Sequence, residues 1–119
     1  MKEIKQKNKR ILLVEDVNEL KLIMKMILES DDFEVVTASN GEAALALYNN
    51  SFDVILTDIV MPVMGGIRLI RELKRINPDV KCLAITGFSD AAVPTEIPLI
   101  HKPVSSSKLL AFVRNELIN

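Results

Sequence analysis

The chain has 119 residues, the size of a single domain with a buried core, and 49% of them are hydrophobic, which excludes a disordered or fibrous protein. Fifteen basic and sixteen acidic residues leave a formal charge of -1, so no overall field favours direct binding of nucleic acid or of an anionic membrane. We expect residues 1–9 to form a frayed basic leader and residues 10–119 to form the folded domain.

No apolar run approaches the ~20 residues that cross a membrane, and the polar start of the chain lacks the apolar core of a secretory signal. The only cysteine, Cys82, lies inside an apolar run and is expected to be a buried thiol in a reducing compartment. A single cysteine excludes an intramolecular disulfide and a cysteine-based metal cluster. We therefore expect a cytoplasmic protein with no membrane partner.

Short apolar segments alternate with segments of helical periodicity along most of the chain. Strands are predicted at residues 10–16, 33–39, 53–58, 80–86 and 97–103, and helices at 17–30, 39–50, 67–76 and 105–118. This alternation is typical of an α/β protein with a doubly wound, five-stranded parallel sheet that is covered by helices on both faces. We expect a flavodoxin-like strand order, 2-1-3-4-5, with right-handed crossovers.

Details of two helices are predicted from single residues. Ser39 stands three residues before Glu42, which is the arrangement of a capping box at the start of the second helix. Met24 and Met26 of the first helix are expected to pack in the core.

The interval between the fourth and fifth strands departs from the regular alternation. Thr86 and Lys102 are sixteen positions apart, which leaves little room for a helix of average length beside two loops and a strand. Pro94 and Pro98 lie within this interval and fit neither a helix interior nor a central strand. The fourth helix of the fold is therefore predicted to be short or missing.

Polar side chains stand where four of the predicted strands end. The first strand ends in Glu15 and Asp16, the third in Asp58, the fourth in Thr86 and the fifth in Lys102. In an open parallel sheet the carboxyl ends of the strands line the ligand crevice, so these five side chains are expected to converge. Singly, each has an ordinary structural explanation, since acids favour the start of a helix. Together they indicate a functional site.

Three carboxylates in one crevice repel one another, so a cation must lie among them. Lys102 is one candidate and Mg²⁺ is another, because Mg²⁺ prefers oxygen ligands and often bridges carboxylates to a phosphate. The central acid, Asp58, is then a candidate nucleophile toward phosphorus. Thr86 and Lys102 are candidate ligands of the phosphoryl oxygens.

These residues resemble the receiver domain of bacterial two-component response regulators over nearly the whole chain. The matching motifs are "VED" at 14–16, "TDIVMPVMGG" at 57–66, "AITG" at 84–87 and "HKP" at 101–103. The resemblance implies that Asp58 accepts a phosphoryl group from a histidine kinase or phosphotransfer protein. Such a chain catalyses its own phosphorylation and dephosphorylation and is not an enzyme with a separate substrate.

The resemblance also implies a role for each site residue. Asp16, Asp58 and the backbone carbonyl of Val60 would hold Mg²⁺, and Glu15 would act on it through water. Thr86 and Lys102 would bind the phosphoryl group. The bond between Lys102 and Pro103 is often cis in the family, and an X-Pro bond makes that form accessible.

Two departures from the family concern the surface that meets partners. The interval after Thr86 is shorter than usual, and Leu99 stands where the family often has a switch aromatic. Both departures put the usual dimerisation and output coupling in question. The sequence therefore does not predict which output protein or fused domain receives the signal. Val60 and Phe88 are predicted to shield the aspartyl phosphate from water.

Three other functions compete with this interpretation. An aspartate-nucleophile phosphohydrolase requires an acid two residues after the nucleophile, where this chain has Val60. A flavodoxin-like cofactor binder requires hydroxyls and amides where Glu15 and Asp16 would repel phosphate. The remaining alternative is a phosphorylation-independent interaction module of the same fold. The chain is either a single-domain regulator or a receiver excised from a longer protein.

Overall fold

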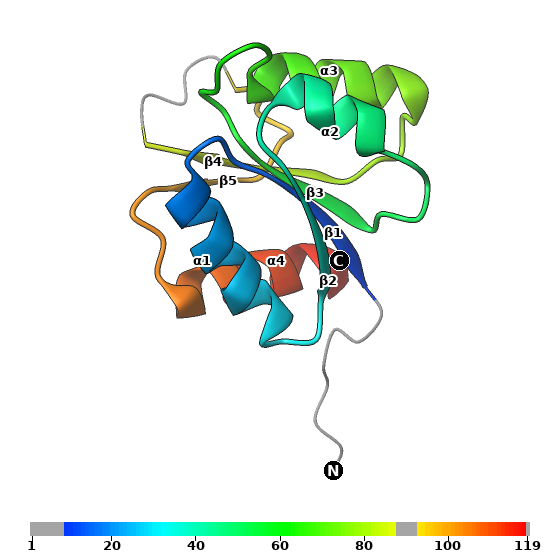
Figure 1. Ribbon diagram of the computed structural model, residues 1–119. Coiled ribbons are helices and arrows are strands. Elements are labelled where there is room, and N and C mark those ends of the chain that lie inside the picture. Colours follow the sequence, from blue (N-terminus) through cyan, green and yellow to red (C-terminus); the bar gives the residue numbers. More distant parts are fainter. Residues whose placement is uncertain (1–8, 88–92, 119) are drawn as a thin grey trace.

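The computed structural model describes residues 9–87 and 93–118 and contains one five-stranded parallel sheet (Figure 1). The strands are β1 (Arg10–Val14), β2 (Glu34–Ala38), β3 (Val54–Asp58), β4 (Cys82–Thr86) and β5 (Leu99–His101). The helices are α1 (Asn18–Glu29), α2 (Gly41–Leu47), α3 (Gly66–Ile76) and α4 (Ser106–Ile118). The strand order is β2-β1-β3-β4-β5, which confirms the predicted flavodoxin-like topology.

Helices cover both faces of the sheet, with α2 and α3 on one side and α1 and α4 on the other (Figure 1). The strands alternate their side chains between the two faces, since Leu12 and Val14 of β1 join the core beneath α2 and α3. Ile11 and Leu13 join the core beneath α1 and α4. A sheet buried on both faces explains why its central strands are apolar almost throughout.

The interval between β4 and β5 confirms the prediction of a short or missing helix. Its described residues, 93–98, form turns and contain no helix. The backbone N–H of Ile97 donates to the carbonyl of Pro94 at 3.0 Å, which closes one of these turns. The flank of α3 therefore lacks a helical neighbour from the described part of this interval.

The predicted capping box is wrong by one residue. Asn40 is the N-cap of α2, and its side chain accepts a hydrogen bond from the backbone N–H of Ala43 at 2.8 Å. The Ser39 hydroxyl accepts a hydrogen bond from Lys21 of α1 at 2.6 Å instead. Asparagine is as good an N-cap as serine, so the sequence offered two candidates and the entry of the chain from β2 selected the later one.

The prediction for the α1 methionines is half correct. Met24 is buried, whereas Met26 is 60% exposed. Residues at positions i and i+2 lie about 200° apart around a helix, so a helix that buries Met24 and Leu28 must turn Met26 toward solvent.

Cys82 is buried in β4, as predicted. None of the helices in the described residues is long and apolar enough to span a membrane. Most of the predicted leader, residues 1–8, lies outside the described residues.

Candidate functional site

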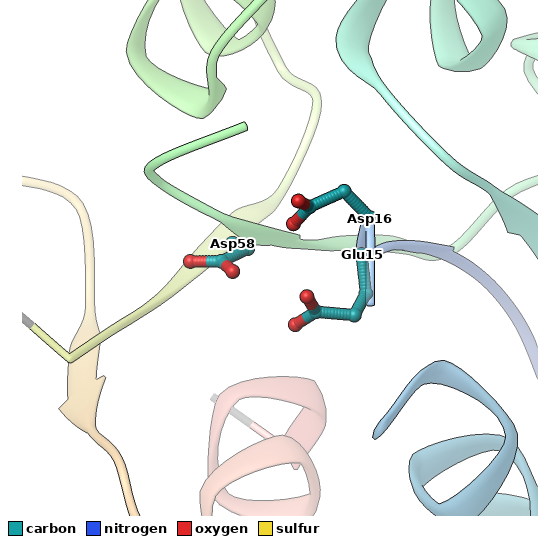
Figure 2. Close-up of side chains that lie close together, drawn as sticks. All are labelled: Glu15, Asp16 and Asp58. Atoms are coloured by element: carbon teal, nitrogen blue, oxygen red, sulfur yellow. The ribbon is translucent and has the colours of Figure 1, made fainter. Parts of the chain in front are cut away.

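The structure brings Glu15, Asp16 and Asp58 together at the carboxyl edge of the sheet (Figure 2). Glu15 and Asp16 follow β1, and Asp58 ends β3, which pairs with β1 in a register that sets Val14 opposite Thr57. Each side chain offers one carboxylate oxygen, and these oxygens all lie within 4.8 Å of one another. Figure 2 shows the three carboxylates pointing into the same space.

Glu15 and Asp58 are buried, and each has one oxygen held by a backbone N–H. The N–H of Ile59 donates to Asp58 Oδ1 at 2.7 Å, and the N–H of Val17 donates to Glu15 Oε2 at 3.1 Å. Val17 is the N-cap of α1 and its own side chain makes no cap, so Glu15 does have a structural role at the start of this helix. Both carboxylates are therefore held in place before any ligand arrives.

The pKa of Glu15 is raised to about 7, chiefly by burial and also by the negative charge of Asp58. The hydrogen bond from the Val17 N–H and the charge of Lys102 oppose this shift in part. Glu15 Oε1 is buried and accepts no hydrogen bond from the described residues. A buried acidic oxygen of this kind, beside two other carboxylates, fits a hard divalent cation such as Mg²⁺.

Lys102 supplies a positive charge to this cluster from the end of β5. Its Nζ lies 2.9 Å from Asp58 Oδ2, to which it donates a hydrogen bond, and 3.4 Å from Glu15 Oε1. The second contact is an ion pair without hydrogen-bond geometry. Partial burial lowers the pKa of Lys102, but the hydrogen bond and charge of Asp58, together with the charge of Glu15, outweigh it and leave that pKa raised.

Backbone contacts place Lys102 beside the end of β4. Its N–H donates to the carbonyl of Thr86 at 2.8 Å, and Thr86 faces His101 in the strand register. Thr86 is fully buried, in the strand next to the one that carries Asp58. The peptide bond between Lys102 and Pro103 is cis, as the family resemblance implies.

The sequence reasoning missed Thr57, which lies in β3 directly before Asp58. Its buried hydroxyl donates to the backbone carbonyl of Asp58 at 2.8 Å. This bond satisfies a polar group inside an apolar strand and fixes the peptide that carries the carboxylate. A hydroxyl residue between Leu56 and Asp58 was the available signal.

The loop after Asp58 packs closely against the strand end. A Cβ atom on Gly66 would lie 2.2 Å from the carbonyl oxygen of Asp58, so only glycine fits there. Val60 is 55% exposed in this loop, and its carbonyl as a metal ligand and its side chain as a shield both stay predictions. The second predicted shield, Phe88, lies outside the described residues.

Leu99, which replaces the switch aromatic of the family, is half-buried in β5. It pairs with Ala84 of β4 and packs against the core cluster beneath α2 and α3. In this structure it is therefore a packing residue of the sheet edge.

Comparisons with known proteins identify the family. The family model for the response regulator receiver domain matches residues 11–114. The response regulator receiver protein CpdR of Brucella abortus is 37% identical in an alignment of 117 residues that covers 92% of this chain and 98% of that protein. Several other curated relatives are longer, and the chain spans about half of their length.

Solved structures agree with this assignment. A response regulator receiver domain from Clostridium thermocellum superposes with a TM-score of 0.84 at 30% identity, covering 92% of this chain and 94% of that one. The response regulator TrrA of Thermotoga maritima, in complex with Mg²⁺ and BeF, has a TM-score of 0.81 at 28% identity, covering 92% and 99%. The chain belongs to the response regulator receiver domain family of two-component systems.

Proposed function

We propose that the chain is a phospho-acceptor switch in which Asp58 receives a phosphoryl group from a histidine kinase or a phosphotransfer protein, with Mg²⁺ as cofactor. The observation that carries this proposal is the convergence of three carboxylates with Lys102 at the end of β3. The relative from Thermotoga maritima, whose structure contains Mg²⁺ and BeF, supports the choice of metal.

The chain's own residues supply the nucleophile and its orientation. Asp58 would attack phosphorus with one carboxylate oxygen, while the bond from phosphorus to the donor nitrogen breaks and its electron pair stays with the imidazole. The N–H of Ile59 holds Asp58 Oδ1 by a hydrogen bond. Asp58 Oδ2, which accepts a hydrogen bond from Lys102 in this structure, is therefore the oxygen placed to attack. Lys102 would then move its hydrogen bond to a phosphoryl oxygen, and Thr86 would supply a hydroxyl to another. Bound Mg²⁺, held by Asp16 and Asp58 with Glu15 and the Val60 carbonyl, would neutralise the charge of the carboxylates and the phosphoryl group.

A groove beside Lys102 supports a protein as the phosphoryl donor. Its volume is about 550 Å³, and its lining joins α1 to the loop after β5, with Leu20, Ile23, Met24, Ile85, Gly87, Lys102, Pro103 and Val104. Within this lining, the apolar side chain of Ile23 on α1 is 53% exposed. Apolar surface next to a reactive carboxylate suits a donor helix that brings phosphohistidine to Asp58.

The compartment and the lifetime of the phosphoryl group complete the proposal. We keep the cytoplasm as the compartment, because buried, unpaired Cys82 suits a reducing environment. Val60 and Phe88 remain proposed shields of the aspartyl phosphate. A half-life of minutes or less that does not change in Phe88→Ala would contradict that role.

Intact-mass measurement after incubation with acetyl phosphate or phosphoramidate, with and without Mg²⁺, tests the proposal. The unmodified protein should gain one phosphoryl group only when Mg²⁺ is present, and Asp58→Asn should gain none. Asp79→Asn removes an exposed acid outside the cluster and should behave like the unmodified protein. If the folded, metal-bound protein gains no phosphoryl group, the interaction module that works without phosphorylation replaces this proposal.

A further inference from the structure

A second groove lies on the other side of the sheet, between α3 and residues 93–98. Its volume is about 470 Å³, and its lining consists of Ile67, Ile70, Arg71, Lys74, Pro78, Pro94, Glu96 and Ile97. None of the residues of the acidic site is in this lining, so the groove is separate from the proposed site of phosphorylation.

The groove occupies the place that the fold normally gives to a helix. In this sheet order, a right-handed crossover from β4 to β5 runs over the same face as α3, so a crossover helix would lie beside α3. Residues 93–98 contain no helix, and the apolar side chains of Ile67, Ile70 and Ile97 form the floor instead. Packed helices lie about 8–10 Å apart, so the flank of α3 is a surface of the kind that another helix covers.

On the side of α3, the groove is lined by two basic residues, Arg71 and Lys74, and α3 as a whole is basic. This helix carries Arg68, Arg71, Lys74 and Arg75 against one acidic residue, Glu72, although the whole chain has a formal charge of -1. Lys74 donates to the carbonyl of Val80, and Arg75 lies 3.4 Å from Glu72. Arg71, an exposed residue of the rim, makes no ion pair with any of the described residues. The charge of this rim is therefore complementary to an acidic partner.

We propose that this groove binds an amphipathic, acidic helix of a partner protein. The apolar residues of that helix would cover the partly exposed Ile67 above the buried Ile70 and Ile97, and its carboxylates would lie against Arg71. A volume of about 470 Å³ accommodates a few apolar side chains, which is how a helix anchors in a groove. Nucleic acid fits less well, because the floor is aliphatic and Glu96 stands on the opposite rim.

Fluorescence anisotropy with a pair of labelled helical peptides tests this proposal on the unphosphorylated protein. Both peptides carry leucines at positions i, i+3, i+4 and i+7, and the flanking positions are glutamate in one and lysine in the other. The acidic peptide should bind saturably, and the basic peptide should bind about tenfold more weakly or not at all. Equal binding of the two peptides, or no saturable binding of the acidic one, would overturn the proposal.

Two variants of α3 locate the binding surface. Arg71→Glu should weaken binding of the acidic peptide about tenfold, because it reverses a charge on the rim. Arg75→Glu makes the same change of charge on the same helix outside the lining, and it should weaken binding by no more than about threefold. If the two variants lost affinity for the acidic peptide equally, the binding would reflect general charge attraction to α3, which would contradict a site in the groove.

Methyl NMR of the isoleucines separates this site from the groove beside Lys102. Addition of the acidic peptide should shift the signals of Ile67, Ile70 and Ile97, and leave the signal of Ile23 on α1 unchanged. Shifts confined to Ile23 would place the peptide in the other groove and overturn the proposal. Because Asp58→Asn should bind the peptide as well as the unmodified protein does, failure here is distinguishable from failure of the proposed phosphorylation.

Discussion

Lys102 Nζ lies 2.9 Å from Asp58 Oδ2, although the two residues are 44 positions apart in the sequence. The contact reaches from the end of β5 across the end of β4 to β3, and it places an ammonium group against the carboxylate that we propose as phospho-acceptor. The ammonium compensates part of the negative charge of the acidic cluster, and it occupies a position next to the proposed metal site.

Replacement of Lys102 by methionine separates metal binding from phosphoryl transfer. Lys102→Met should bind Mg²⁺ a few-fold more tightly, because the ammonium repels a cation that binds the same carboxylates. Its phosphorylation by phosphoramidate should be at least about tenfold slower, because Lys102 is the proposed ligand of a phosphoryl oxygen. Isothermal titration calorimetry and intact mass measure the two effects. Lys25→Met, which removes a half-exposed lysine of α1, is the control and should change neither.

Magnesium should stabilise the folded protein through the acidic cluster. A ligand at about ten times its dissociation constant adds about 1.4 kcal/mol to the free energy of unfolding. Thermal unfolding with and without MgCl₂ should show this gain in the unmodified protein and in Asp79→Asn, and little of it in Asp16→Asn. An equal gain in Asp16→Asn would show that the metal acts elsewhere on the protein.

The thiol of Cys82 should be inert in the native protein below about pH 9. Burial raises the pKa of this thiol from 9.0 to about 11, and the charge of Lys74 opposes the shift only in part. Since the pKa is higher in the folded state, the contribution of Cys82 to stability is present below pH 9 and is lost as the pH rises toward 11.

Two measurements check the behaviour of Cys82. Iodoacetamide at pH 8.5 should modify the protein in denaturant and leave it unmodified under native conditions. Denaturant unfolding between pH 9 and 11 should show a steeper loss of stability for the unmodified protein than for Cys82→Ala. Rapid native alkylation would contradict the burial of this thiol.

Val63 adopts a backbone conformation that a β-branched residue rarely adopts. Its φ is 70°, and its side chain is 71% exposed, so the strain is not offset by burial. Val63→Asn should raise the free energy of unfolding by about 1 kcal/mol, because asparagine tolerates this conformation. Val60→Asn changes a second exposed valine of the same loop that lacks a positive φ, and it should give no gain. Chemical denaturation of the two variants provides the comparison.

Arg114 of α4 forms a bidentate ion pair with Asp31, which lies just after the end of α1. Its Nε and Nη2 lie 2.7 and 2.6 Å from the two carboxylate oxygens, and the Asp31 side chain is only 6% exposed. Arg114→Met should lower the free energy of unfolding by about 2 kcal/mol, because it leaves a buried carboxylate without its charged donor.

A double variant identifies the cause of that loss. Arg114→Met with Asp31→Asn should be less destabilised than Arg114→Met alone, because no buried charge remains. The exposed pair of Lys25 and Glu29 is the reference, and its loss in Lys25→Met should cost less than about 0.5 kcal/mol. If Arg114→Met costs no more than Lys25→Met, the pair contributes little to stability.

The order of elements and the acidic edge of the sheet were predictable from the sequence alone. Apolar runs and helical periodicity are local patterns, and parallel strands must end at a common edge, so Glu15, Asp16 and Asp58 were expected together. The proline content and short length of the interval before Lys102 likewise predicted that a helix would be short or missing.

Tertiary structure decided what local patterns leave open. Ser39 and Asn40 are equally good caps, and only the path of the chain from β2 selects Asn40. The exposure of Met26 follows from the face that α1 presents to the sheet, which depends on packing. Three further features depend on the folded backbone and on the packing of elements. They are the hydrogen bond from Thr57 to the Asp58 carbonyl, the positive φ of Val63 and the basic groove beside α3. Sequence patterns record which residues can be buried, whereas packing determines which groups meet.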